Sequence, residues 1–67
     1  MRDELLSWRQ RLEWTQREAA SFLDVPVSTY RGWEQGRREV HNPGPVRRLL
    51  RLAYFQHNAQ DIIDRTS

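Results

Sequence analysis

The side chains of this sequence with the clearest chemical potential are its arginines, which supply all 11 of its basic residues. Five of them fall within residues 37–51 beside a single acid, a local charge of +4, although the whole chain of 67 residues carries only +2. These five are Arg37, Arg38, Arg47, Arg48 and Arg51. Arginine pairs bidentately with phosphate and with guanine, so this segment suits an anionic polymer such as a nucleic acid. A solvated helix face, or the codon usage of a GC-rich genome, would give the same arginines.

Other kinds of chemistry lack the residues that they need. There is no cysteine, which excludes disulfides and thiolate metal sites. His41 and His57 lie sixteen residues apart with no cysteine nearby, so a metal site is not expected. No Gly-rich phosphate loop is present, and no nucleophile stands with a plausible base. We therefore expect no enzyme and no cofactor, metal or small-molecule ligand. The apolar runs are short and no signal peptide is visible, so we expect a cytoplasmic protein without membrane contact.

Apolar residues recur at helical spacing along the chain, which predicts amphipathic helices. These helices are expected to position the arginines. The first helix is expected over residues 3–13, with an inner stripe at i, i+3, i+4 and i+7 spacing. The stripe consists of Leu5, Trp8, Arg9 and Leu12. A second helix is expected over residues 15–23, because Thr15 and Glu18 have the spacing of a capping box.

A third helix is expected over residues 27–35, shortly after the second. Pro26 can open it, since the amide hydrogen that proline lacks has no helical partner there, and Gly36 is well placed to end it in the left-handed conformation. Tyr30 and Trp33 lie on one face and are expected to point inward. Two short helices joined by a turn of about three residues form a helix-turn-helix, which presents its second helix to a DNA major groove. Many αα corners without a DNA role have the same spacing.

The last third of the chain is expected to contain a loop and two further helices. The loop covers residues 36–44, a fourth helix covers residues 45–55, and a short fifth helix covers residues 58–64 within a possible dimerisation tail, residues 56–67. The fourth helix is apolar on more than one side, which one small core does not need. The surplus side is a candidate dimer interface made by Leu52, Phe55, Ile62 and Ile63.

Three stretches carry a resemblance to a known family. They are Leu5 to Leu12 with its apolar stripe, Trp14 to Arg38 with Thr15, Gln16, Glu18, Ala20, Leu23, Val25, Ser28, Thr29, Tyr30, Trp33, Glu34, Gln35, Gly36 and Arg37, and the run from Gly44 to Ala53. In these positions the sequence resembles the Xre/Cro–cI family of helix-turn-helix transcriptional regulators. The resemblance implies an all-α, lambda-repressor-like domain of four to five helices, filling residues 1–67 as a single DNA-binding unit.

The resemblance also implies which side chains meet DNA. The candidate DNA-binding residues are Gln16, Arg17, Val27, Ser28, Arg31, Gly32, Arg37 and Arg38. Gln16 would bind a phosphate at the start of its helix, and Arg31 would bind a guanine in the groove. Gly32 has no side chain and could only permit close approach, from an exposed position on the third helix. Arg9 and Glu34 resemble the family's ion pair between the first and third helices.

Three positions depart from the family pattern. Asp24 stands where glycine is usual, although aspartate tolerates the left-handed region better than most residues. Pro26 replaces a capping side chain worth about 0.5–2 kcal/mol, and Gly32 costs about 1 kcal/mol relative to alanine inside a helix. The third helix is therefore expected to be marginal alone.

The implied function is sequence-specific binding of double-stranded DNA by a homodimer at an inverted-repeat operator, with half-sites about 34–36 Å apart. With no effector domain in these residues, the simplest mechanism is occlusion of a promoter by an autoregulatory repressor of phage or mobile-element type. Anti-CRISPR-associated regulators and antitoxin-like regulators share this size and layout. The alternative is an antitoxin or protein-interaction adaptor that uses the apolar surface of the fourth helix and the C-terminal tail.

Overall fold

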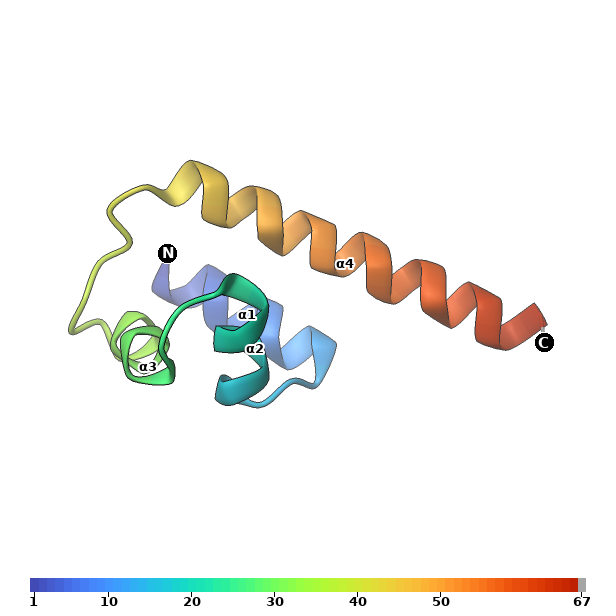
Figure 1. The fold of residues 1–67 in the computed structure, drawn as a ribbon, viewed down its shortest axis with the longest axis horizontal. Helices are drawn as coiled ribbons and strands as arrows, with labels where there is room; N and C mark the ends of the chain where they lie inside the picture. Colours follow the sequence, from blue (N-terminus) through green and yellow to red (C-terminus); the bar gives the residue numbers. More distant parts are fainter. Residues whose placement is uncertain (67) are drawn as a thin grey trace.

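The computed structural model describes the backbone of residues 1–66 and the side chains of residues 1–57. It contains four helices and, within the described residues, no strand: α1 (Arg2–Leu12), α2 (Gln16–Leu23), α3 (Val27–Gln35) and α4 (Pro43–Thr66). The first three helices form a small cluster, and α4 lies alongside α1 before its second half extends past that cluster (Figure 1). The overall dimensions are 43 × 22 × 19 Å. The predicted all-α helix-turn-helix fold is confirmed.

Local side-chain chemistry sets the start of α2. The Thr15 hydroxyl accepts a hydrogen bond from the Glu18 amide at 3.1 Å, and the Glu18 carboxylate accepts one from the Thr15 amide at 3.1 Å. This reciprocal capping box satisfies two amides that the first turn of a helix leaves unpaired. The chain reaches Thr15 from α1 through Glu13, whose φ of 58° is left-handed. The start of α2 thus agrees with the sequence prediction to within one residue.

The turn between α2 and α3 is tight because Asp24 adopts the left-handed conformation, with φ 58° and ψ 45°. Aspartate therefore does here what glycine does in the family pattern, at the modest cost that its short polar side chain allows. Pro26 then precedes α3 with φ −59°, and no side chain caps the helix. The C-terminus of α3 is better closed, because Gly36 takes φ 77° and its amide bonds back to the carbonyls of Gly32 and Trp33.

The C-terminal prediction was wrong in two respects. First, α4 begins at Pro43 and not at Pro45, because both prolines fit in the first turn, where no amide hydrogen is required. Second, the expected break between a fourth and a fifth helix is absent, and α4 continues through Asn58 to Thr66. Nothing between Phe55 and Asn58 is a proline or glycine, so the backbone hydrogen bonds of the helix simply continue.

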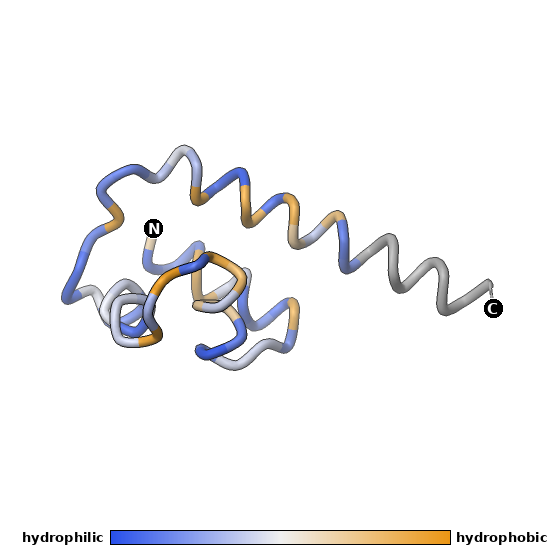
Figure 2. Tube along the Cα trace, in the orientation of Figure 1, coloured by the Kyte–Doolittle hydropathy of each residue, from blue (hydrophilic) through white to orange (hydrophobic). Residues whose placement is uncertain are grey.

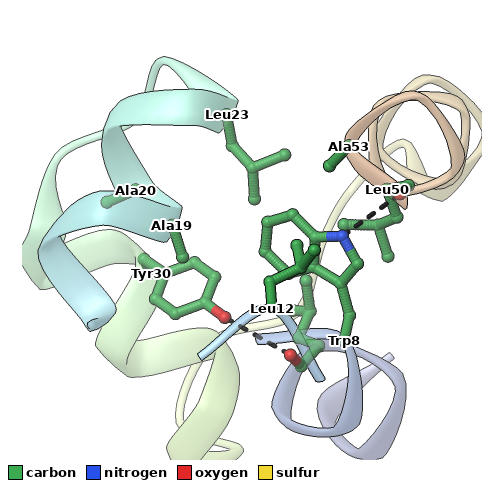
Figure 3. Close-up of a cluster of buried hydrophobic side chains, with 9 residues drawn as sticks. Trp8, Leu12, Ala19, Ala20, Leu23, Tyr30, Leu50 and Ala53 are labelled. Carbon is green, nitrogen blue, oxygen red and sulfur yellow. Dashed lines mark hydrogen bonds between the residues drawn. The ribbon is translucent and has the colours of Figure 1, made fainter. Parts of the chain in front are cut away.

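The core is built around Trp8 of α1, which inserts between α2 and α4 (Figure 3). Its indole nitrogen donates a hydrogen bond to the Leu50 carbonyl at 3.1 Å, which ties α4 to the cluster. On the other side of the core, Tyr30 of α3 is fully buried and its hydroxyl donates to the Leu5 carbonyl at 3.5 Å. The remaining buried apolar residues are Leu12, Ala19, Ala20, Leu23 and Ala53. Two aromatic side chains thus connect α1 with both α3 and α4.

One side of α4 has no partner in the described part of the chain. Leu50 and Ala53 point into the core, whereas the side chains of Leu52 and Phe55 remain 45% and 73% exposed. Apolar positions recur along α4 as far as its side chains are described (Figure 2). Ile62 and Ile63, the other two residues of the predicted dimer interface, lie outside the residues whose side chains are described. Over the described residues, no helix has both the length and the apolar character needed to cross a membrane.

Candidate nucleic-acid interface

The outer side of α3 carries three exposed polar side chains, Ser28, Arg31 and Gln35, at i, i+3 and i+7 spacing. The opposite side is anchored by Tyr30, which is fully buried, and by Trp33, which is half-buried with its ring 6.3 Å from that of Tyr30. Burial is the main cause that raises the pKa of the Tyr30 hydroxyl, which therefore stays a neutral hydrogen-bond donor. The helix is thus held by its aromatic side and presents a polar one.

An ion pair fastens α3 to α1. The Arg9 guanidinium donates to both carboxylate oxygens of Glu34, at 2.7 and 3.0 Å, and a third hydrogen bond of 3.1 Å reaches the Trp14 carbonyl. The Glu34 side chain is only 5% exposed and that of Arg9 19%. Bidentate geometry and shielding from water make this a stronger interaction than a surface pair. The pair also reaches the turn between α1 and α2 through Trp14.

The same carboxylate organises the start of α2. The Gln16 side-chain amide donates to Glu34 Oε1 at 3.1 Å, and the Gln16 side-chain oxygen accepts from Arg31 Nε at 3.1 Å. A continuous hydrogen-bonded series therefore leads from Arg9 through Glu34 and Gln16 to Arg31. Arg31 is thus positioned on the outer side of α3 by contacts that begin in the protein interior. Its terminal guanidinium nitrogens take no part in this contact and are the atoms that would meet a base.

Glu34 remains a carboxylate in spite of its burial. Burial alone would raise its pKa, but the hydrogen bonds from Arg9 and Gln16 help to offset this, and the pKa lies below the ordinary value of 4.5. The same interaction raises the pKa of Arg9. The series is therefore charged at both of its inner members at neutral pH.

Gly32 is not exposed, contrary to the sequence prediction. It is buried, because the aliphatic part of the Arg38 side chain lies over it. A β-carbon built on Gly32 would come within 3.0 Å of both Cγ and Cδ of Arg38. The backbone reverses direction at Gly36, and the amides of Arg37 and Arg38 both donate to the Gly32 carbonyl, at 3.0 and 3.2 Å.

The other candidate DNA-binding residues surround the outer side of α3. Arg17 and Arg37 are exposed, and neither makes an ion pair within the described residues. Val27 is half-buried and packs partly against the core, so only part of its side chain faces outward. Gln35 is exposed on the same side as Ser28 and Arg31 and was not among the predicted residues. Its spacing of four from Arg31 was the signal that could have identified it.

The arginines of α4 are arranged differently. Arg47 pairs with Glu4 of α1 through two hydrogen bonds, of 2.9 and 3.2 Å, while Arg48 and Arg51 are exposed. The interaction lowers the pKa of Glu4 and raises that of Arg47. The basic segment seen in the sequence is therefore divided between the loop after α3 and a separate helix.

Comparison with protein families agrees with this geometry. The sequence profile of a family described as a helix-turn-helix domain matches residues 1–59, which cover α1, α2, α3 and the greater part of α4. Neither a search of curated proteins nor a search of solved structures returned a match.

Proposed function

The chain belongs to the helix-turn-helix domain family, and we propose that it is a sequence-specific regulator of the Xre/Cro–cI type that binds double-stranded DNA with α3 in the major groove. The observation that carries this proposal is the two-sided character of α3. Tyr30 faces the core, while Ser28 and Arg31 face outward, and Arg31 is held through Gln16. The hydrogen bond to Gln16 already orders the Arg31 side chain in part. Binding a guanine bidentately therefore costs it less conformational entropy than it would cost an unconstrained arginine.

Phosphate contacts would set the affinity and the register on DNA. In our proposal Gln16, Arg17, Arg37 and Arg38 bind the backbone on both sides of the groove, while Ser28, Arg31 and the exposed part of Val27 read bases. Gly32 has no direct contact with DNA in this arrangement, because the side chain of Arg38 covers it. Helix-turn-helix DNA-binding domains are typically non-enzymatic, and the proposed activity requires binding alone.

The proposed active form is a homodimer. The side chains of Leu52 and Phe55 are exposed on α4. Because α4 runs away from α3 toward its C-terminal end (Figure 1), we propose that a second copy packs on α4 and leaves α3 uncovered. Two copies related by a twofold axis would read an inverted repeat, with half-sites about 34–36 Å apart. A dimer bound over a promoter would block polymerase, which makes autoregulatory repression the simplest mechanism.

Selection from random duplex DNA, followed by binding measurements on the selected site, tests base recognition. Arg31→Ala should weaken binding by about 1–3 kcal/mol and relax discrimination at one base position. Arg48→Ala is the matched control, because it removes the same charge from an exposed position on α4 and should leave discrimination unchanged. Equal binding of the wild-type protein to the selected and a scrambled duplex would contradict the proposal.

The mass in solution tests the dimer and separates it from the alternative of an antitoxin or interaction adaptor. Light scattering should give twice the chain mass of 8.1 kDa, and Phe55→Gln should lower it to that of a monomer because it removes exposed apolar area. Gln56→Ala, on the same exposed turn, should leave the dimer intact. A wild-type monomer that binds no duplex DNA specifically would favour the adaptor, for which Leu52 and Phe55 form the exposed contact.

A further inference from the structure

The contact between Gly32 and Arg38 joins the recognition helix to the loop that follows it. The stem of Arg38 lies directly on the Gly32 backbone, since a β-carbon at Gly32 would approach its Cγ and Cδ to 3.0 Å and its Cβ to 3.4 Å. Carbon atoms in ordinary contact are about 3.5–4.0 Å apart. A side chain at position 32 would therefore have to shift the stem by a few tenths of an ångström.

The backbone around this contact cannot easily yield. The Gly32 carbonyl accepts hydrogen bonds from the amides of Gly36, Arg37 and Arg38, and Gly36 occupies a left-handed conformation that favours glycine. These bonds hold the Arg38 backbone over the last turns of α3. A side chain at position 32 would therefore move the Arg38 stem by rotation about its own bonds, which displaces the guanidinium at its end even further.

Glycine at this position has no other evident structural use. It lies inside a helix without a positive φ, where alanine is the more favourable residue. Arg38 is exposed, and it lines a surface hollow together with Thr29 and Trp33 of α3 and His41 of the loop. Arg38 thus occupies the space that a side chain of residue 32 would otherwise fill.

We propose that Gly32 is a positioning residue for Arg38: its bare backbone seats the Arg38 stem on α3 and thereby holds the guanidinium for a phosphate of the bound DNA. This inference rests on the proposed function and assigns Gly32 a role different from close approach of DNA to the helix. It predicts that a methyl group at position 32 impairs DNA binding only through Arg38.

A double-mutant cycle tests the proposal with wild-type, Gly32→Ala, Arg38→Ala and the combined variant, each bound to the selected duplex over a range of salt concentrations. Gly32→Ala should weaken binding about threefold or more, as expected when a charged hydrogen bond is strained. It should also lower the slope of log K against log salt concentration by up to about 0.9, the value of one phosphate contact. In the Arg38→Ala background the same change should have no effect. The midpoint of thermal unfolding should not fall, because alanine favours the helix.

Three outcomes would overturn the proposal. Unchanged DNA binding by Gly32→Ala would show that the Arg38 side chain does not need the bare backbone at position 32. Equal weakening in the Arg38→Ala background would show that the methyl group obstructs DNA directly. Absence of nuclear Overhauser contacts between the Gly32 α-protons and the Arg38 side chain in the free protein would show that the seat is not occupied, whatever the protein does with DNA. If those contacts are present but the wild-type protein binds no duplex specifically, the proposed function fails, and with it the role of the seat in binding.

Gly44→Ala provides the matched control for DNA binding. A β-carbon at Gly44 would have no atom within 4 Å, so the substitution adds the same methyl group without displacing a neighbour. Its affinity for the selected duplex should equal that of the wild-type protein. Because Gly44 precedes a proline, which restricts the residue before it, this control serves for affinity and not for stability.

Discussion

Replacing Arg9 by methionine should destabilise the protein strongly. Methionine keeps an unbranched stem on the inner side of α1, so the change removes the guanidinium with little loss of packing. What remains is the Glu34 carboxylate, 5% exposed, with two strong charged hydrogen bonds lost. The Trp14 carbonyl loses its hydrogen bond from Arg9 as well.

The burial of Glu34 allows an estimate of the expected loss in the free energy of unfolding. Removing one partner of a buried ion pair costs about 3–5 kcal/mol, because the other charge is left without compensation. Arg9 is 19% exposed and water can enter the vacated space, so the lower end, about 3 kcal/mol, applies. A chain of 67 residues has a free energy of unfolding of roughly 3–10 kcal/mol. Arg9→Met should therefore remove a large share of the stability.

The stability difference between the wild-type protein and Arg9→Met should depend on pH in a defined direction. In the wild-type protein the pKa of Glu34 is lowered, so the stabilisation is present above its ordinary value of 4.5 and is lost as the pH falls through the lower folded value. Without Arg9, burial becomes the dominant cause and raises the pKa of Glu34 relative to the wild-type protein. The variant then gains a proton on folding at acidic pH. The difference in stability between the two proteins should narrow as the pH falls from 7 to 4.

Urea unfolding followed by tryptophan fluorescence and circular dichroism measures these differences. Arg47→Met serves as the control, because its pair with Glu4 lies on the surface and should contribute too little to resolve. Combining Arg9→Met with Glu34→Leu should restore most of the lost stability, since an apolar pair often replaces a buried ion pair without cost. A loss below about 1 kcal/mol for Arg9→Met, typical of a surface pair, or a loss independent of pH, would refute this reasoning.

Three further substitutions test the elements that support the site. Thr15→Ala should lower the free energy of unfolding by about 1 kcal/mol, because it removes the capping box of α2, and an unchanged urea midpoint would contradict the role of the cap. Trp8→Phe should cost about 1–3 kcal/mol through the lost hydrogen bond to Leu50 and the reduced packing, and calorimetry should show a lower unfolding temperature. Gly36→Ala should cost about 1–2 kcal/mol because φ is 77° there, whereas a neutral result would mean that the end of α3 can rearrange.

The parts of the fold that follow from local chemistry were predictable from the sequence. The capping box at Thr15 and the terminator at Gly36 depend on residues a few positions apart, so the sequence alone locates them. The prediction of a helix break before Asn58 was wrong for a related reason. Asparagine is a good N-cap, but it caps a helix only where the preceding residues leave the helical conformation, and residues 55–57 have no reason to do so.

The arrangement of the site depended on contacts that no local pattern reveals. That Gln16 lies between Glu34 and Arg31 follows from the angle at which α2 meets α3. Gly32 is covered because the amides of Arg37 and Arg38 bond to its carbonyl and the Arg38 side chain lies over it. A helical projection of α3 alone shows position 32 as exposed, because it contains no information about the residues that follow the helix.

Under the proposed function, the position of Glu34 links the stability of this domain to its recognition of DNA. A carboxylate near the C-terminal end of α3 faces the negative end of the helix dipole and is buried, so it needs donors from other helices. Arg9 supplies them from α1 and Gln16 from α2, and Gln16 in turn holds Arg31. An apolar pair at positions 9 and 34 could restore stability but could not hold the Gln16 amide. The combined Arg9→Met and Glu34→Leu variant should therefore unfold like the wild-type protein and yet bind its selected duplex more weakly, with reduced discrimination at the base read by Arg31. Wild-type discrimination by this stable variant would show that Arg31 finds its base without the buried carboxylate.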